Sequence, residues 1–192
     1  MFIDYLTLVM VNLVAGTGLL AYFVFKGLGG ENQKSYAPAF GMVGLVALGA
    51  GLHMTFTWPL PGSFNIAFGE STVLFGAVFL GTAITLAMNG SLMPISIYAF
   101  FAGLYSVIVG LRIIDLGITK HPWASGIGFV LAGLGGLVAA PGMKLLKENK
   151  AVRYFATAVL VLITIFWAYT FYESLWGHME SFSSWTPPTL GQ

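Results

Sequence analysis

Six long runs of apolar residues alternate with short polar breaks along this chain, and each run has a length suited to crossing a membrane. The runs cover residues 2–26, 37–58, 69–88, 92–115, 123–141 and 151–176. A helix of about 20 apolar residues spans the roughly 30 Å of hydrocarbon in a bilayer. The runs are continuously apolar, whereas the strands of a membrane β-barrel alternate apolar and polar positions. The pattern therefore predicts an all-α, polytopic membrane protein with six transmembrane helices.

The breaks between the runs carry residues that start or stop helices. Asn89-Gly90-Ser91 is typical of a tight turn. Proline fits the first turn of a helix but interrupts its interior. We therefore expect Pro122 to open the fifth helix and Pro141 to close it. Residues 1–180 are predicted to form one six-helix domain, and residues 181–192 a short extramembrane tail.

The composition supports a membrane location and removes several classes of function. The chain has 192 residues, of which 57% are apolar and only 8% are charged. A soluble domain carries about 25% charged residues, so this chain could not coat a water-facing surface. The absence of cysteine excludes disulfides, thiolate metal sites and cysteine nucleophiles. A net charge of +1 without a basic stripe indicates no nucleic-acid partner.

One end of the predicted bundle is basic and the other is acidic. The first end carries six basic residues and two acids, whereas the second carries two basic residues, five acids and all three histidines. The six basic residues are Lys26, Lys34, Lys144, Lys147, Lys150 and Arg153. Lys and Arg resist transfer across the membrane, so the basic end is expected to face the cytoplasm. Because the number of spans is even, both termini are then expected outside.

Small residues recur at regular intervals along several runs. Gly128, Ala132, Gly136 and Ala140 are four apart in the fifth run, and Ser96, Gly103, Gly110 and Gly117 are seven apart around the fourth; Ala47 and Gly51 form a further pair. Such rows let helix backbones approach closely, which favours association in lipid. The rows fit two arrangements, packing inside one bundle or packing between subunits of a homo-oligomer or a larger membrane complex.

His53 is the most unusual residue within a predicted span. It precedes Trp58 by five residues, which places it about 7 Å deeper along the helix. Ionisable residues inside a membrane are candidates for function, although a structural histidine bonded between helices is the simpler alternative. A buried imidazole needs a polar partner. We therefore expect His53 to lie within reach of an acid on a neighbouring helix, either Glu70 or Asp115.

Other ionisable side chains fall near the same outer end of different runs. Arg112 and Asp115 are three apart and are expected to share a helix face and pair. Glu70 opens the third run and Glu173 lies near the end of the sixth. Each has a structural explanation alone, such as an interfacial ion pair or an acid favoured by a helix dipole. Together they predict an outward-facing site formed by His53, Glu70, Arg112, Asp115 and Glu173.

The residues give limited support to metal, haem or enzyme chemistry. No His-x-x-Glu or His-x-x-x-His spacing occurs within a predicted span. A metal site that uses His53 and Glu70 stays open, as does a haem with His53 as one ligand, but the sequence requires no cofactor. No P-loop, nucleophile elbow, dinucleotide fingerprint or zinc-protease motif is present. The sequence therefore gives no positive indication of an enzyme.

Two stretches carry a resemblance to known families. TFTWPLPGSFNIAFGESTVLFG, from Thr55 to Gly76, resembles the signature of a prokaryotic family of small polytopic membrane proteins of unknown function. That likeness implies a multi-pass protein of a prokaryotic plasma membrane. VLFGAVFLGTAITLAMN, from Val73 to Asn89, is similar to a helix of the amide and urea channel family. This second likeness implies six helices, outside termini, assembly in rings and an acid at the position of Glu173. The paired tryptophans that line those pores have no match in the fifth run.

Three functions fit these observations. The first is a membrane channel or simple transporter for a small polar solute, with an ionisable outer vestibule. The second is a metal- or haem-binding membrane subunit linked to redox chemistry. The third is a non-catalytic accessory subunit that stabilises a larger membrane complex through its glycine rows.

Overall fold

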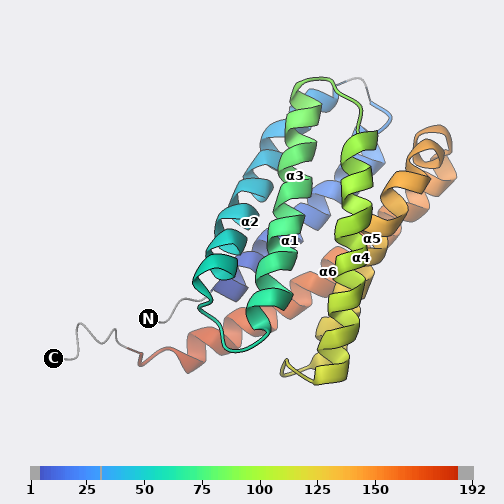
Figure 1. Cartoon of the computed structure of the whole chain (residues 1–192). Coiled ribbons are helices and arrows are strands. Elements are labelled where there is room, and N and C mark those ends of the chain that lie inside the picture. The colour runs from blue at the N-terminus through green and yellow to red at the C-terminus, as the bar shows by residue number, and fades with distance from the viewer. Residues whose placement is uncertain (1–4, 31, 186–192) are drawn as a thin grey trace.

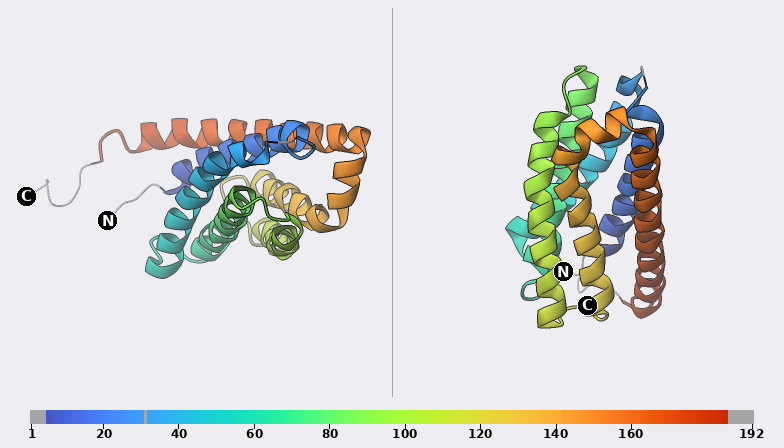
Figure 2. Two further views of the ribbon diagram at one scale, coloured as in Figure 1. Left: turned by 90° about the horizontal axis from the view of Figure 1, so that it is seen from above. Right: turned by 90° about the vertical axis from the view of Figure 1, so that its right-hand side faces the viewer.

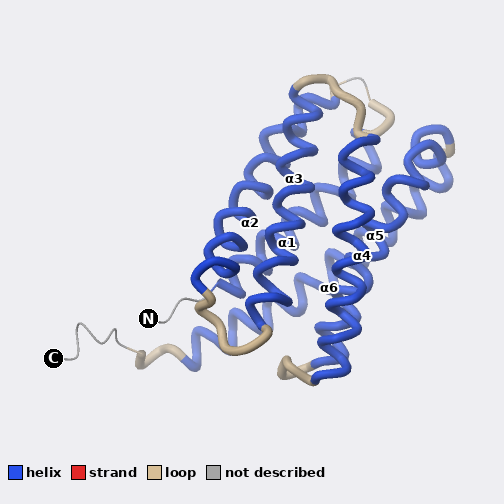
Figure 3. The backbone as a smooth tube through the Cα atoms, in the orientation of Figure 1, coloured by secondary structure: helices blue, strands red, loops and turns tan. Residues whose placement is uncertain are grey.

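The computed structural model describes residues 5–30 and 32–185, and all regular secondary structure within them is helical (Figure 3). The chain forms α1 (Tyr5–Tyr22), the π-helical η1 (Phe23–Gly27), the 3-10 helix η2 (Gln33–Tyr36), α2 (Ala37–Thr57), the π-helical η3 (Asn65–Glu70), α3 (Ser71–Ala87), α4 (Met93–Leu116), α5 (Pro122–Glu148) and α6 (Lys150–Ser181). Together they make six stretches that are long and apolar enough to cross a membrane, and in the first three a π- or 3-10 helix continues into or out of an α-helix. The predicted all-α, six-span membrane fold is confirmed.

Two helix ends differ from the prediction. Pro141 lies inside α5, which continues to Glu148, so the prediction that Pro141 closes this helix is wrong. A proline removes one backbone hydrogen bond and displaces the helix axis, but the helix can resume beyond it. Figure 2 shows the last turns of α5 bending sharply away from the rest of the helix. At the other end of the chain, α6 extends to Ser181, beyond the predicted limit of 176.

The predicted tail, residues 181–192, is described only in part. Ser181 ends α6, and residues 182–185 make turns, including a hydrogen bond from the Trp185 amide to the Phe182 carbonyl. Residues 186–192 lie outside the described residues.

The six spans pack mainly as three antiparallel pairs. The most extensive contacts join α4 with α5, α2 with α3, and α1 with α6. Figure 1 shows these pairs as a bundle in which α1 and α6 run behind α3 and α4 at a slant to them. The start of α1 and the end of α6 lie at the same lower end of that view.

A seam of glycines brings α4 and α5 into backbone contact. A Cβ added to Gly103 would lie 2.5 Å from the Gly133 carbonyl oxygen, and one added to Gly136 would lie 2.5 Å from the Ala99 carbonyl oxygen. Gly110 faces the carbonyl oxygen of Gly126 in the same way, at 2.6 Å. Side chains larger than hydrogen would force these helices apart.

These small residues therefore pack inside the bundle, but the residues of the α5 row do not all meet the same helix. Gly128 faces α6, where its added Cβ would lie 2.7 Å from Cζ2 of Trp167. A step of four residues turns about 40° beyond a full turn. A row with that spacing consequently winds around α5 and meets two neighbouring helices.

A second close seam joins α2 to α3. Ala47 is 1% exposed. A Cβ on Gly51 would lie 2.7 Å from the Val73 amide nitrogen, and one on Gly76 would lie 2.7 Å from the Leu48 amide nitrogen. The predicted pair Ala47 and Gly51 thus packs within the bundle.

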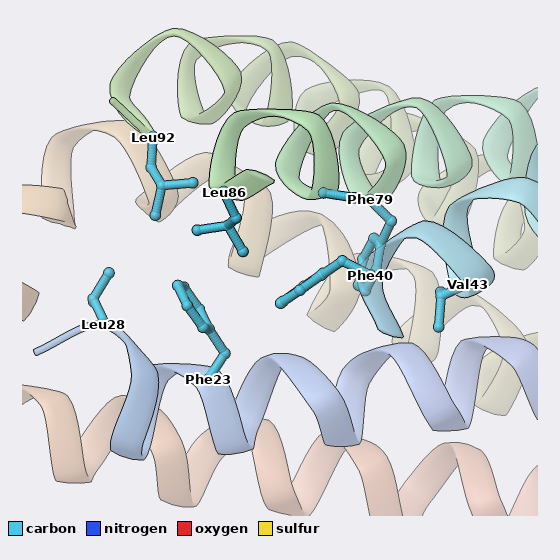
Figure 4. Close-up of a cluster of buried hydrophobic side chains, with 8 residues drawn as sticks. Phe23, Leu28, Phe40, Val43, Phe79, Leu86 and Leu92 are labelled. Atoms are coloured by element: carbon cyan, nitrogen blue, oxygen red, sulfur yellow. The ribbon is translucent and has the colours of Figure 1, made fainter. Parts of the chain in front are cut away.

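The buried apolar side chains form two main clusters at different depths. The first contains Phe23, Phe40, Phe79, Leu86 and Leu92, among others, and joins the ends of α1, α3 and α4 to α2 (Figure 4). Its rings interlock, with the centroids of Phe23 and Phe40 and those of Phe40 and Phe79 each 5.4 Å apart. The second contains Ala67, Val109, Ile113, Phe129, Ile163 and Trp167 and joins α4, α5 and α6 to η3. Dispersion and close packing in these clusters hold the pairs together.

The connections separate into two ends. The α1–α2, α3–α4 and α5–α6 connections lie toward the upper end of Figure 1, and the α2–α3 and α4–α5 connections lie at the lower end. The six basic residues named above fall on the first set of connections and their helix ends, which we call the basic end. The histidines and most acids fall at the opposite end, which we call the acidic end.

Candidate functional site

His53 lies on the outside of the bundle near the acidic end. Its side chain is exposed and bonds to Tyr5 of α1 and Thr57 of α2. The Tyr5 hydroxyl is close to Nδ1 and 3.4 Å from Nε2, and the Thr57 hydroxyl is 3.0 Å from Nδ1. The prediction that His53 bonds to Glu70 or Asp115 is wrong. Among the described residues, its imidazole bonds to hydroxyl groups and to no carboxylate.

Glu70 bonds to α4, whereas the predicted bond was to His53 of α2. Its Oε2 accepts a hydrogen bond of 2.6 Å from the hydroxyl of Tyr105 on α4. The same hydroxyl lies 3.2 Å from the Ile66 carbonyl oxygen. Because Ile66 and Glu70 are both in η3, Tyr105 joins this π-helical turn to α4. Glu70 therefore positions the start of α3 against its neighbour.

The remaining predicted site residues make local contacts. Arg112 and Asp115 form the predicted ion pair, with side chains 60% and 62% exposed. Glu173 accepts a hydrogen bond of 2.7 Å from the hydroxyl of Tyr169, one turn earlier on α6. The structure thus places all five predicted residues toward the acidic end, but apart from the Arg112–Asp115 pair it bonds none of them to another.

A cavity of about 1950 Å³ runs along the bundle between α1, α3, α4, α5 and α6. It is open to the surface along part of its length, where the lining residues Leu134, Val138 and Phe155 are 47%, 58% and 72% exposed. Its lining extends from Leu28, Leu92 and Leu146 near the basic end to Lys120 and Ser181 at the acidic end. Of the described residues of α2, only Ala47 lines it. Glu173 lines the cavity, whereas His53, Glu70, Arg112 and Asp115 do not.

The mouth of this cavity at the acidic end contains ionisable residues that sequence reasoning left out of the site. Lys120 and His121 come from the α4–α5 connection, and Glu173 and His178 come from the last turns of α6. Both histidines lie next to the ends of predicted spans, and this shared position is the signal in the sequence that could have identified the mouth.

The middle of the cavity is walled by aromatic rings from three elements. Phe68 of η3, Phe129 of α5 and Trp167 of α6 all line it. The ring centroids of Phe68 and Phe129 are 5.7 Å apart, and those of Phe129 and Trp167 are 6.1 Å apart. The indole of Trp167 on α6 packs against Gly128 of α5.

Three buried polar atoms on the cavity wall have no hydrogen-bond partner in the described part of the chain. They are Oγ of Ser71, Oγ1 of Thr119 and Nε1 of Trp167. A buried donor without a partner costs about 1–3 kcal/mol. Water or a polar solute inside the cavity could satisfy these groups, because each residue lies on its wall.

The arrangement provides no metal centre within the described residues. No group of three or more His, Asp or Glu side chains there could hold an ion. His53 and Glu70, the candidate ligands, are bonded to Tyr5 and Tyr105 respectively.

Comparison with known proteins identifies a fold and a family. No curated protein matches the sequence. Among solved structures, the chain is similar to the Helicobacter pylori urea channel in its closed state, with a TM-score of 0.67, 22% sequence identity, and coverage of 92% of this chain and 99% of that one. At this identity the likeness establishes the fold. Residues 1–181 match the family described as protein of unknown function DUF981, and the chain belongs to that family.

Proposed function

We propose that this protein is a passive channel or simple transporter for a small, uncharged polar solute. The observation that carries the proposal is the long cavity of about 1950 Å³ with unpartnered hydrogen-bonding groups on its wall. The fold shared with a urea channel supports the same conclusion. Urea is the first solute to test, because its carbonyl oxygen can accept from the indole N–H of Trp167.

The charge distribution along the cavity favours an uncharged solute. Among the described lining residues, the ionisable ones are Lys120, His121, Glu173 and His178, all at the acidic-end mouth. The deeper wall is apolar, with scattered hydroxyl and amide groups. An ion entering that region would lose its hydration without gaining a partner of opposite charge, which is costly in a medium of low dielectric constant.

The outer vestibule is proposed at this mouth, where Glu173 keeps the role predicted for it. His53, Glu70, Arg112 and Asp115 would support the surrounding helices, since they lie off the cavity. The plasma membrane of a prokaryote is the proposed location. A homo-oligomer is the proposed assembly, because α6 buries only Ile163 and Trp167 among its described residues and leaves a long apolar surface for a neighbour.

A flux measurement with two matched variants tests the proposal. Gly135 lines the cavity and Gly49 lies on α2 away from it, and a Cβ at either position would meet no atom within 4 Å. Gly135→Trp should reduce urea flux into proteoliposomes toward that of protein-free vesicles. Gly49→Trp should retain the wild-type flux, because its side chain has open space outside the pathway.

Two results would contradict this proposal. Wild-type flux equal to that of protein-free vesicles for urea and other small amides would favour the accessory-subunit function. An absorption band of a haem, or a metal found by elemental analysis of the purified protein, would favour the redox-linked function instead.

A further inference from the structure

The end of α1 and the start of α6 lie side by side at the basic end. The ring centroids of Phe25, in η1, and Tyr154, in the first turns of α6, are 5.6 Å apart. Figure 2 shows the two segments running together as the blue and orange ribbons. Both elements carry basic residues at this point, Lys26 on η1 and Lys150 and Arg153 on α6.

Arg153 lies between these elements and has no anionic partner within the described part of the chain. Its guanidinium lies against the backbone of Gly29, because a Cβ added to Gly29 would be 3.1 Å from Cζ of Arg153. Its Nε is buried and has no hydrogen-bond acceptor among the described residues. The ion pair between described residues is Arg112–Asp115, at the opposite end of the bundle. A guanidinium offers five N–H donors, so a buried one strongly favours an anion nearby.

The start of α6 also favours a bound anion at this position. Asn149 caps the helix by accepting from the amides of Ala151 at 2.9 Å and Val152 at 3.2 Å. The first turn contains no acid and begins with Lys150. Basic side chains at the positive end of a helix dipole are unfavourable, and an anion there is favourable. Lys150 and Arg153 are three apart and so share a face of the helix.

We propose that Arg153, Lys150 and Lys26 bind the phosphate of an anionic phospholipid where η1 meets the start of α6. A lipid fits better than a soluble phosphate because the site continues into an exposed aromatic surface. Phe25 is 39% exposed, Tyr154 52% and Phe155 72%. These rings lie one turn or less from the basic groups and can contact the acyl chains. Basic pockets between transmembrane helices commonly bind anionic headgroups in this way. Lys26, Lys150 and Arg153 do not line the proposed solute pathway, whereas Phe155 does, and the inference does not depend on that pathway.

Native mass spectrometry of the purified full-length protein with added lipid tests this inference. The wild type should retain phosphatidylglycerol in preference to phosphatidylcholine. Arg153→Gln and Lys150→Gln should each reduce that preference by about fivefold, the value of one basic residue near an anionic surface. Arg153→Lys should retain part of it. Lys120→Gln, at the acidic end, is the matched control and should bind as the wild type does.

Three outcomes would overturn the inference. The first is equal retention of the two lipids by the wild type, which needs no variant and holds even if Arg153→Gln fails to fold. The second is inorganic phosphate raising the thermal stability as much as phosphatidylglycerol does, which would indicate a site for a soluble anion. The third concerns Glu31, two residues beyond Gly29 in the sequence. If Glu31→Gln destabilises the lipid-free protein as much as Arg153→Gln does, the partner of Arg153 is internal.

Discussion

Individual hydrogen bonds between helices weigh heavily in this protein because hydrocarbon offers no alternative partner. The Glu70–Tyr105 bond of 2.6 Å joins η3 to α4. Tyr105→Phe keeps the ring and removes the hydroxyl, so we expect it to lower the free energy of unfolding by about 1 kcal/mol. Tyr98→Phe is a matched control, because Tyr98 lies on the same helix and bonds to no described side chain. Equal thermal stability of the two variants in detergent would contradict a structural role for Glu70.

The site residues also show which contacts a sequence can predict. Arg112 and Asp115 were paired correctly because residues three apart on a helix are neighbours whatever the rest of the fold does. His53 was given the wrong partner because its bond to Tyr5 depends on how α1 and α2 are rotated about their axes. Similarly, the position of Trp167 on the cavity wall follows from the packing of α6 against Gly128. No local spacing encodes either relation.

At the scale of helices, backbone contact between α4 and α5 makes adjacent glycines unequal. A Cβ on Gly136 would lie 2.5 Å from the Ala99 carbonyl oxygen, whereas one on Gly135 would meet no atom within 4 Å. We expect Gly136→Leu to abolish stable folding or lower the unfolding temperature markedly, since close packing is the main force between these helices. Gly135→Leu should leave the unfolding temperature nearly unchanged. Leu134→Ala should also be mild, because Leu134 is 47% exposed. Similar stability of the two leucine variants in detergent would mean that the seam is not closely packed.

Helix lengths show which features of the fold follow from composition and which do not. The six spans followed from apolar length alone, because only helices of about that length satisfy their backbone groups in lipid. The ends did not follow, since α5 continues past Pro141 and α6 reaches Ser181. Both extensions carry charged residues, Lys144 and Lys147 in α5 and Glu180 in α6, which suit the surface of a bilayer. Water there relaxes the hydrophobic requirement, so a kinked or polar turn can persist.

Across the whole molecule, the separation of basic and acidic ends fixes how the functions proposed here face the cell. The cavity mouth with Lys120 and Glu173 lies at the acidic end, and the proposed lipid site at Arg153 lies at the basic end. If the basic end faces the cytoplasm, solute enters from outside and the phospholipid belongs to the inner leaflet. The reverse orientation would exchange both assignments without changing a single contact in the fold.

Labelling of single cysteines decides between these orientations, and the chain contains no cysteine that could give a background. In intact cells, a membrane-impermeant maleimide should modify Lys120→Cys on the α4–α5 connection. It should modify Lys147→Cys on the bent end of α5 only after the membrane is opened. The reason is that lysine-rich connections remain on the cytoplasmic side during insertion, and the basic end holds six basic residues against two acids. Labelling of position 147 from outside would reverse the orientation. The cavity mouth would then open into the cytoplasm, and the proposed lipid site would lie in the outer leaflet.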